Sequence, residues 1–270
     1  KIAHWASNPF FKDHTIYGAA LAFYIPILFV FTLRRNQPLL LKVAYVSILS
    51  IFVIALIFSY SRAAWLSIIG ALGVFVLIRF RVSLKLIFGG VLLIVLALMM
   101  SWSQIMIRLE QNRQESSVEN IGEHVKSVTN IRNDASNLER INRWQSAFRM
   151  FEEKPMLGFG PGTYMFQYAP YQMSYEKTII STNAGDVGNA HSEYFGPLAE
   201  QGIFGPLVYI ALIITVLVVG IRRYYKLINV WVRDVNLAAI LGLVTYFIHG
   251  FLNNFLDTDK LSAPFWGFIA

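Results

Sequence analysis

Residues 39–78 read LLLKVAYVSILSIFVIALIFSYSRAAWLSIIGALGVFVLI, and this stretch decides the fold class. Two apolar runs, Leu39 to Ser59 and Ala63 to Ile78, are separated only by Tyr60-Ser61-Arg62. A transmembrane helix needs about 20 mostly apolar residues, so each run is long enough, or nearly long enough, to cross a bilayer. The stretch therefore predicts two membrane helices joined by a tight turn.

The overall composition is that of a membrane protein. Of the 270 residues, 56% are hydrophobic and 14% are charged, which is too apolar for a soluble domain of this size. The net charge of +7 would suggest nucleic acid in a soluble protein, but the basic residues flank apolar runs, so membrane topology explains them better. The absence of cysteine excludes disulfides and thiol catalysis. We therefore expect no nucleic-acid partner and an all-α fold, a polytopic transmembrane helical bundle.

The apolar runs divide the chain into three parts. We predict transmembrane helices in 1–101, a long loop with amphipathic helices in 102–202, and further transmembrane helices in 203–270. The chain starts at Lys1 and stops within an apolar run, which predicts a fragment truncated at both ends. The remaining expected spans are Thr15 to Leu33, Leu84 to Ser101, Ile203 to Ile221, Val235 to Leu252, and a last one that starts at Leu261.

Basic residues gather in alternate connectors between these spans. Because positive residues in short loops mark the cytoplasmic side of a membrane, these connectors are predicted to be cytoplasmic. The opposite, external side then receives the Tyr60-Ser61-Arg62 turn, the long loop, and the turn from Asn253 to Lys260. The basic connector residues are Arg34, Arg35, Lys42, Arg79, Arg81, Lys85, Arg222, Arg223, Lys226 and Arg233.

The long external loop carries two helix signals. Ser136 and Glu139 have the spacing of a capping box, and apolar residues at helical spacing follow, so we predict an amphipathic helix from Asn137 to Glu153. The glycine-rich residues 158–162 are interpreted as a turn, because a phosphate-binding loop would need a preceding strand and a lysine. A second short helix is predicted to open near Asn189.

Arginines on the external side are candidates for binding an anion. Arg62 is the only charged residue of a short external turn, so it either binds an anion or extends to lipid head groups. Arg140 and Arg143 lie one turn apart on the predicted amphipathic helix, and guanidinium groups bind phosphate oxygens in pairs. Arg143 has Glu139 four residues earlier and could instead form an ordinary helical ion pair, whereas Arg140 has no acidic residue in that position. Arg149, with glutamates three and four residues later, is expected to form only an exposed ion pair.

Three histidines are further candidates on this side. His191 lies at the predicted helix start, where the helix dipole disfavours a charged imidazole, so it is interpreted as a neutral base; the alternative is an ordinary hydrogen-bonding surface residue. His249, near the external end of its span, either lines the same cavity or forms an interhelical hydrogen bond. His14 beside Asp13 is a weak pair, and no histidine and acidic cluster has metal-ligand spacing, so no metal site is expected.

Three groups of motifs resemble the O-antigen ligase and polymerase family. Their order, and their placement on one side of the membrane, match that family, and the resemblance extends over nearly the whole chain. Ser192 is a departure, since many relatives carry Asn after the histidine. The matching stretches are Tyr60-Ser61-Arg62-Ala63-Ala64-Trp65, Arg140-x-x-x-Trp144 with Lys154-Pro155-Met156-Leu157-Gly158-Phe159-Gly160, and Ala190-His191-Ser192-Glu193-Tyr194 with Glu200-Gln201-Gly202-Ile203-Phe204-Gly205.

The resemblance implies a glycosyltransferase at the periplasmic face of the bacterial inner membrane. The donor would be a glycan on undecaprenyl diphosphate, whose lipid tail lies in a groove open to membrane lipids, and the acceptor a sugar hydroxyl such as one on lipid A core. Arg62 and Arg140 would stabilise the leaving diphosphate, and His191 would position or deprotonate the acceptor, without a metal or cofactor. Further substrate-binding residues would be Arg143, Trp144, Tyr194, His14 and His249.

Other functions remain open at this point. An O-antigen polymerase and a protein O-oligosaccharyltransferase would share this site and differ from a ligase in the acceptor. A lipid-linked glycan transporter belongs to a different class, in which charges within the membrane mark a substrate path. Against a transporter, the candidate charges lie in the long external loop and the spans hold almost none. The ligase is therefore the favoured interpretation.

Overall fold

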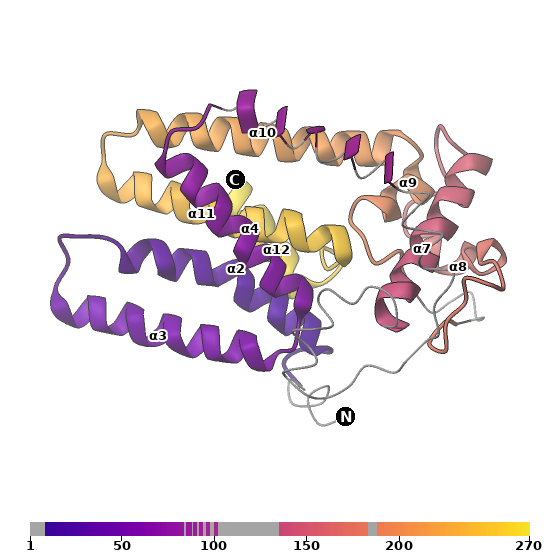
Figure 1. Cartoon of the computed structure of the whole chain (residues 1–270), viewed down its shortest axis with the longest axis horizontal. Coiled ribbons are helices and arrows are strands. Elements are labelled where there is room, and N and C mark those ends of the chain that lie inside the picture. Colours follow the sequence, from indigo (N-terminus) through magenta and orange to yellow (C-terminus); the bar gives the residue numbers. More distant parts are fainter. Residues whose placement is uncertain are drawn as a thin grey trace. The chain divides into compact units, whose positions relative to one another are not determined.

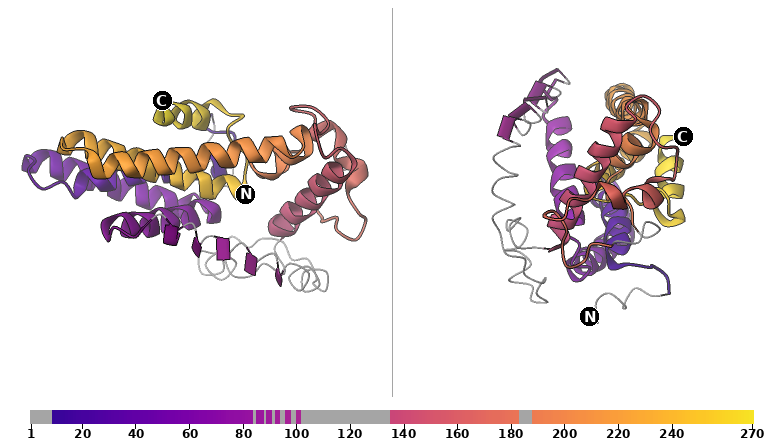
Figure 2. Two further views of the ribbon diagram at one scale, coloured as in Figure 1. Left: turned by 90° about the horizontal axis from the view of Figure 1, so that it is seen from above. Right: turned by 90° about the vertical axis from the view of Figure 1, so that its right-hand side faces the viewer.

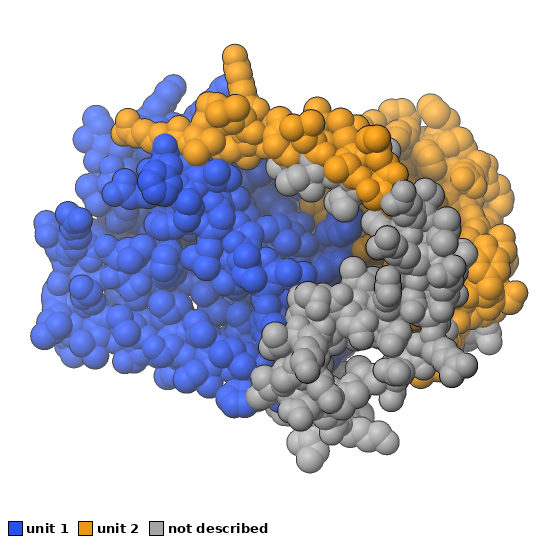
Figure 3. All heavy atoms as spheres, viewed as in Figure 1, with its two compact units in different colours: residues 1–80, 210–270 blue, residues 81–209 orange. Residues whose placement is uncertain are grey.

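The computed structural model describes residues 9–83, 85–87, 89–90, 92–93, 96–97, 100–101, 135–182 and 188–270. Within these ranges all regular secondary structure is helical, which confirms the predicted all-α fold (Figure 1). The chain divides into two compact units (Figure 3). Unit 1 comprises residues 1–80 and 210–270, and unit 2 comprises residues 81–209.

Five helices are long and apolar enough to cross a membrane, as the polytopic bundle requires. Three of them follow the predicted runs closely, and the fourth extends to Lys226 rather than Ile221. The fifth begins at Val230 rather than Val235, because the Asn229 side chain caps it by accepting hydrogen bonds from two backbone N–H groups. The predicted span from Leu84 to Ser101 lies partly outside the described residues, and its described residues are helical. The last apolar run forms helix α12 (Asp259–Ile269). The five helices are α2 (His14–Thr32), α3 (Leu39–Phe58), α4 (Arg62–Arg79), α10 (Phe204–Lys226) and α11 (Val230–Leu252).

The helices of unit 1 run side by side, with α2 and α11 at the centre (Figure 1, Figure 2). Helix α11 packs on α2 and α4, and α2 also packs on α3. Gly242 allows α11 to approach α2 closely, since a Cβ at this position would lie 3.0 Å from the backbone oxygen of Phe23. Helices α3 and α10 are largely exposed and apolar, as helices that face lipid are.

The basic connectors of unit 1 gather at one end of the helices. Arg34, just after α2, lies 3.9 Å from the carboxylate of Asp234 and 4.8 Å from the ring centroid of Trp231, both on α11. Tyr225 near the end of α10 donates a hydrogen bond of 2.8 Å to the carbonyl of Ile78 near the end of α4. The opposite end therefore carries the beginnings of α2 and α4 and the end of α11.

Unit 2 is built on α7 (Ala135–Glu153), which confirms the predicted amphipathic helix. Helix α9 (Phe195–Gln201) and the short 3-10 helix η1 (Ala169–Tyr171) pack against α7, and α8 (Tyr164–Gln167) packs on both of these shorter helices. The predicted capping box was wrong. Helix α7 starts before Ser136, and the Glu139 carboxylate is bound by side chains of α7 and of the following loop instead of reaching back to the helix start.

The glycine-rich turn at residues 158–162 packs against the end of α9. Three backbone hydrogen bonds join the two segments. The N–H of Phe159 donates to the carbonyl of Ala199 at 3.1 Å, and the N–H of Gly160 donates to the carbonyl of Glu200 at 2.8 Å. In the opposite direction, the N–H of Ile203 donates to the carbonyl of Pro155 at 2.9 Å. We call residues 155–160 together with 199–203 the glycine clamp. It confirms that residues 158–162 form a turn, and it joins two of the motif stretches by backbone hydrogen bonds.

Glycine is required at two positions of the glycine clamp. Gly158 and Gly202 have φ angles of 62° and 64°, which other residues rarely adopt. A Cβ on Gly158 would collide with the backbone of Glu200, and one on Gly202 would collide with the backbone of Met156. The two chain segments can therefore approach this closely only because neither glycine carries a side chain.

Candidate functional site

Arg62 occupies a constrained turn in unit 1. It is the first residue of α4 and is half-buried, and the preceding Ser61 is 2% exposed. Tyr60, two residues earlier, has a left-handed backbone with a φ of 51°. This conformation is strained for a residue other than glycine and is found mostly where the surrounding structure enforces it.

His14 and Gly18, on the first turns of α2, support this turn. The Nδ1–H of His14 donates to the carbonyl of Ser59 over 2.8 Å. A Cβ on Gly18 would lie only 2.6 Å from the Cβ of Ser61, so α2 meets the turn directly. Asp13 caps α2 by accepting a hydrogen bond from a backbone N–H at 2.7 Å. The predicted pair of His14 and Asp13 therefore serves the start of α2 and the turn that carries Arg62.

His249 lies at the end of α11, at the same end of unit 1 as Arg62 and His14. Its side chain is 1% exposed, and its Nε2 accepts a hydrogen bond of 3.2 Å from the side-chain amide of Asn253. Asn253 is the C-cap of α11. This hydrogen bond lies within one helix end, whereas the sequence suggested one between helices.

In unit 2, Arg143 and Glu139 form a buried ion pair on α7. Their Nε and Oε1 atoms are 2.6 Å apart, and their side chains are 4% and 5% exposed. The guanidinium also donates to Thr182 Oγ1 at 2.9 Å and lies 3.9 Å from the ring centroid of Tyr168. The ion-pair interpretation of Arg143 is confirmed, but the pair is buried rather than at the surface. A buried charge is tolerated only with such partners.

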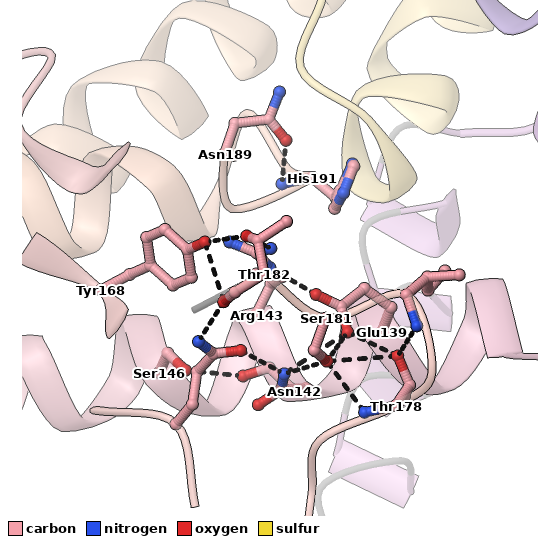
Figure 4. Close-up of polar contacts among 12 residues, drawn as sticks. Glu139, Asn142, Arg143, Ser146, Tyr168, Thr178, Ser181, Thr182, Asn189 and His191 are labelled. Atoms are coloured by element: carbon pink, nitrogen blue, oxygen red, sulfur yellow. Dashed lines mark hydrogen bonds and ion pairs between the residues drawn. The ribbon is translucent and has the colours of Figure 1, made fainter. Parts of the chain in front are cut away.

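The pair is part of a wider set of polar contacts that binds the loop after η1 to α7 (Figure 4). Glu139 Oε2 accepts hydrogen bonds from Ser181 and, at 2.8 Å, from Thr178. Asn142 donates to Gln172 at 2.8 Å and to Ser181 at 3.2 Å. We call this set the α7 polar network; its members are Glu139, Asn142, Arg143, Gln172, Thr178, Ser181 and Thr182.

Sequence reasoning missed the α7 polar network because its partners are distant in sequence. Thr178 and Ser181 are separated from Glu139 by 39 and 42 positions. Neither hydroxyl stands out among the serines and threonines of the loop, so no spacing rule could identify them.

The segment that leads to His191 lies against the α7 polar network. A Cβ on Gly188 would collide with the guanidinium of Arg143, so the chain passes over the buried ion pair just before the histidine. Figure 4 shows the Asn189–His191 turn beside Arg143 and Thr182. The N–H of His191 donates to Asn189 Oδ1 at 3.1 Å, and His191 has a left-handed φ of 49°. The histidine therefore occupies a strained turn, as residues at functional sites often do.

The predicted helix start at Asn189 was wrong. Helix α9 begins at Phe195 with Tyr194 as its N-cap residue, and the Ser192 Oγ accepts hydrogen bonds from the N–H groups of Tyr194 at 3.2 Å and Phe195 at 3.4 Å. His191 lies three residues before this N-cap, where the effect of a helix dipole has largely decayed. The dipole argument for a neutral imidazole therefore does not apply.

Arg140 lies near the beginning of α7. Its Nη1 donates to Ser136 Oγ at 3.0 Å and to Asn137 Oδ1 at 3.3 Å, so the side chain folds back along the first turn of the helix. It is half-buried, whereas Arg143, one turn later, is buried. The sequence separates the two arginines by the glutamate available to Arg143, and the structure likewise gives them different environments.

Trp144 and Tyr194 pack within unit 2. Trp144 is 8% exposed, with its ring centroid 5.1 Å from that of Phe195. The ring centroids of Tyr194 and Tyr209 are also 5.1 Å apart. Burial raises the pKa of the Tyr194 phenol above its ordinary range, so it is a neutral hydrogen-bonding group at physiological pH.

Arg149 corrects one expectation from the sequence. It does not form an exposed pair with the glutamates of its own helix; it pairs with Glu176, at 2.7 Å between Nη1 and Oε2, and donates to the carbonyl of Tyr171 at 2.7 Å. The side chains of Arg149 and Glu176 are 21% and 9% exposed. The hydrogen bond to Glu176 raises the pKa of Arg149. Arg149 thus joins η1 and the next segment to α7.

The described ranges contain no group of three or more histidine, cysteine, aspartate or glutamate residues arranged to hold a metal ion. A protein-family model described as O-Antigen ligase matches residues 47–210, more than half of the 270 residues, and this region includes Arg62, Arg140 and His191. None of the curated proteins matches the chain. With five helices able to cross a membrane and this family match, the chain is a multi-pass membrane protein that belongs to the O-antigen ligase family.

Proposed function

We propose that this chain is the ligase among the glycosyltransferases of its family. It transfers a glycan from undecaprenyl diphosphate to an acceptor sugar, such as one on lipid A core, at the periplasmic face of the inner membrane. The observation that supports this most is the family match over residues 47–210, which contains all three candidate catalytic residues. The positive-inside rule assigns the same three residues to the external side.

In the proposed reaction an acceptor hydroxyl oxygen attacks the anomeric carbon of the donor glycan. The bond between this carbon and the diphosphate oxygen breaks, and the diphosphate leaves with the electron pair. Arg62 and Arg140 stabilise the negative charge that develops on the leaving group. His191 accepts the proton of the hydroxyl, and direct displacement inverts the anomeric carbon. This reaction balances without a metal ion or cofactor.

The other candidate residues are proposed to position the segments that carry the catalytic residues. Arg143 is engaged by Glu139 and Thr182 and lies under Gly188, so it sets the position of the turn that carries His191. His14 has the corresponding role under the Arg62 turn through the carbonyl of Ser59. Trp144 and Tyr194 contribute packing near His191, and His249 shapes the end of α11 on the same side as Arg62.

A transfer assay tests the proposal and separates it from its alternatives. Purified full-length protein is incubated with an undecaprenyl-diphosphate-linked glycan and, in turn, with lipid A core, with further donor, or with an acceptor peptide. A ligase joins the glycan to lipid A core, and transfer persists in a metal chelator. Longer glycans on undecaprenyl diphosphate would identify a polymerase, and glycosylated peptide a protein O-oligosaccharyltransferase. Movement of the donor across a vesicle membrane without any joining would identify a transporter.

Cysteine labelling tests the proposed sidedness. The natural chain has no cysteine, so each introduced thiol is unique. Ser174 in unit 2 and Ser83 after α4 are both exposed, which makes them a matched pair. An impermeant thiol reagent added from the periplasmic side should label Ser174→Cys and spare Ser83→Cys. The reverse pattern would invert the topology and remove His191 from the periplasm.

A further inference from the structure

Four large apolar side chains are exposed at the junction between the end of α7 and the start of α10. Met156 and Leu157, which follow Pro155, are 59% and 77% exposed. Ile203 and Phe204 are 37% and 51% exposed. We call these four residues the apolar wedge. Exposed apolar clusters of this kind mark surfaces that bind a partner or a membrane.

The glycine clamp holds the two halves of the apolar wedge together. The N–H of Ile203 donates to the carbonyl of Pro155 at 2.9 Å, and Gly202 packs against the backbone of Met156. All of these residues belong to unit 2. Met156 and Leu157 are therefore fixed at the level where α10 begins, although they lie 48 and 47 positions before Phe204 in the sequence.

The apolar wedge is continuous with a membrane-spanning surface. Helix α10 starts at Phe204 and is one of the five candidate spans. Leu207 and Val208, on its next turn, are 53% and 69% exposed. A helix that enters a bilayer in this way has its first exposed apolar residues at the boundary between acyl chains and head groups.

The backbone next to the apolar wedge is suited to the edge of a bilayer. Unpaired backbone groups are costly where water is scarce, so irregular segments there must satisfy their polar groups internally. The N–H groups of Gly158, Phe159 and Gly160 all donate to backbone carbonyls, at 3.1, 3.1 and 2.8 Å. Pro155 has no N–H, and its carbonyl accepts from Ile203.

The charges beside the apolar wedge indicate what kind of membrane contact it makes. The Nζ of Lys154 lies 4.2 Å from the ring centroid of Phe159, in position for the head-group region. Glu152 and Glu153 are exposed on the last turn of α7, and Glu153 accepts a hydrogen bond of 2.5 Å from Tyr171. With one cation and two carboxylates, this face has no basic excess that would select anionic lipids.

We infer that the apolar wedge inserts into the outer part of the acyl-chain layer and fixes unit 2 to the membrane surface. The occupant of this surface is the bilayer itself, through Met156, Leu157, Ile203 and Phe204, and insertion depends on apolar burial rather than on lipid charge. The inference does not depend on the reaction that the protein catalyses.

Depth-resolved fluorescence quenching tests this inference. A bimane label is placed on Leu157→Cys or, as the matched control, on Ser174→Cys, and each full-length protein is reconstituted into phosphatidylcholine vesicles. The Leu157 label should show blue-shifted emission, strong quenching by lipids brominated on their acyl chains, and protection from aqueous iodide. The Ser174 label should show the opposite. Adding anionic phosphatidylglycerol should leave both results unchanged. A second label on Met156→Cys repeats the measurement should the first variant prove unstable.

Three outcomes would overturn the inference. Equal iodide quenching of the Leu157 and Ser174 labels would show that the surface is in water. Protection of the Leu157 label only after lipid A core is added would assign the surface to the acceptor. Protection that disappears when the protein is diluted in the vesicles would assign it to a second copy of the chain.

Discussion

The two units hold their candidate residues in different ways. In unit 1, Arg62, His14 and His249 lie at the ends of apolar helices, and helix packing decides where they are. In unit 2, the turn that carries His191 lies over the α7 polar network, where a buried ion pair fixes the position of the turn. Geometry that depends on a few polar contacts can be lost by changing one side chain, whereas geometry set by helix packing is spread over many contacts.

The largest effect is expected at His191 in unit 2. His191→Ala should lower transfer by about 10²–10⁴-fold, the usual contribution of a general base. Donor binding should be largely retained, because the arginines are proposed to hold the diphosphate. The checks are initial rates of transfer and binding of labelled donor.

Matched substitutions separate the imidazole from the strained backbone at this position. His191→Asn tolerates the left-handed φ of 49° and should be as inactive as His191→Ala. His191→Lys and His191→Arg should also fail, since a cation cannot accept the proton. Substantial activity in His191→Lys would move His191 from proton transfer to diphosphate binding.

Arg62 in unit 1 and Arg140 in unit 2 allow the contributions of the two units to transfer to be compared. Arg62→Ala and Arg140→Ala should each reduce transfer by about 10²–10³-fold, the typical loss when one group that stabilises transition-state charge is removed. Protein levels and thermal stability should stay near those of the natural chain, which is measured in parallel. Arg223→Ala, an exposed arginine in the last turn of α10, is the control and should be silent. Normal transfer in Arg140→Ala would exclude it from the site.

The buried ion pair tests directly whether unit 2 depends on polar contacts. Arg143→Met should destabilise unit 2 by about 3–5 kcal/mol, because it leaves the Glu139 carboxylate buried without its partner. The expected result is faster hydrogen exchange in residues 172–182 and lower transfer. The double variant Glu139→Gln with Arg143→Met should recover part of that stability, as coupled neighbours do. Additive effects would show that the pair does not act as a unit.

The smallest effect is expected at Arg149. Its removal should cost about 1.5–3 kcal/mol, the range for hydrogen bonds to charged groups. Arg149→Ala should increase hydrogen exchange around Tyr171 and Glu176 while reducing transfer less than Arg143→Met does. Arg149→Lys should restore part of the protection. An exchange pattern unchanged from the natural chain would instead support an exposed ion pair between Arg149 and the glutamates of its own helix.

Much of this architecture follows from local sequence patterns. Apolar length predicts the membrane helices, and helical spacing of apolar residues predicts α7 within two residues at its start. The failures have specific physical causes. Ser136 and Glu139 match a capping box, but an ion pair with Arg143 engages the carboxylate instead. Asn189 resembles a helix start because its side chain binds a backbone N–H two residues later, which a turn does equally well.

The candidate site is harder to predict because its supports are non-local. Local spacing predicts that Arg149 pairs with glutamates on its own helix, whereas the structure pairs it with Glu176, 27 positions away. The motifs identified His191 and Arg62, but they gave no sign that His191 has a left-handed backbone or that a left-handed residue lies two positions before Arg62. Spacing rules describe neighbours within a helix, and these contacts cross from one segment of the chain to another.

The glycine clamp also bears on how family members can be recombined. Because residues 155–160 and 199–203 share backbone hydrogen bonds and interlocking glycines, a graft that replaced only one of them would meet a mismatched surface. Chimeras intended to exchange acceptor preference between relatives should therefore transplant residues 135–203 as one cassette, with junctions before α7 and after Ile203. Splitting the cassette between the two segments should give poorly assembled hybrids, whatever the identity of the parent proteins.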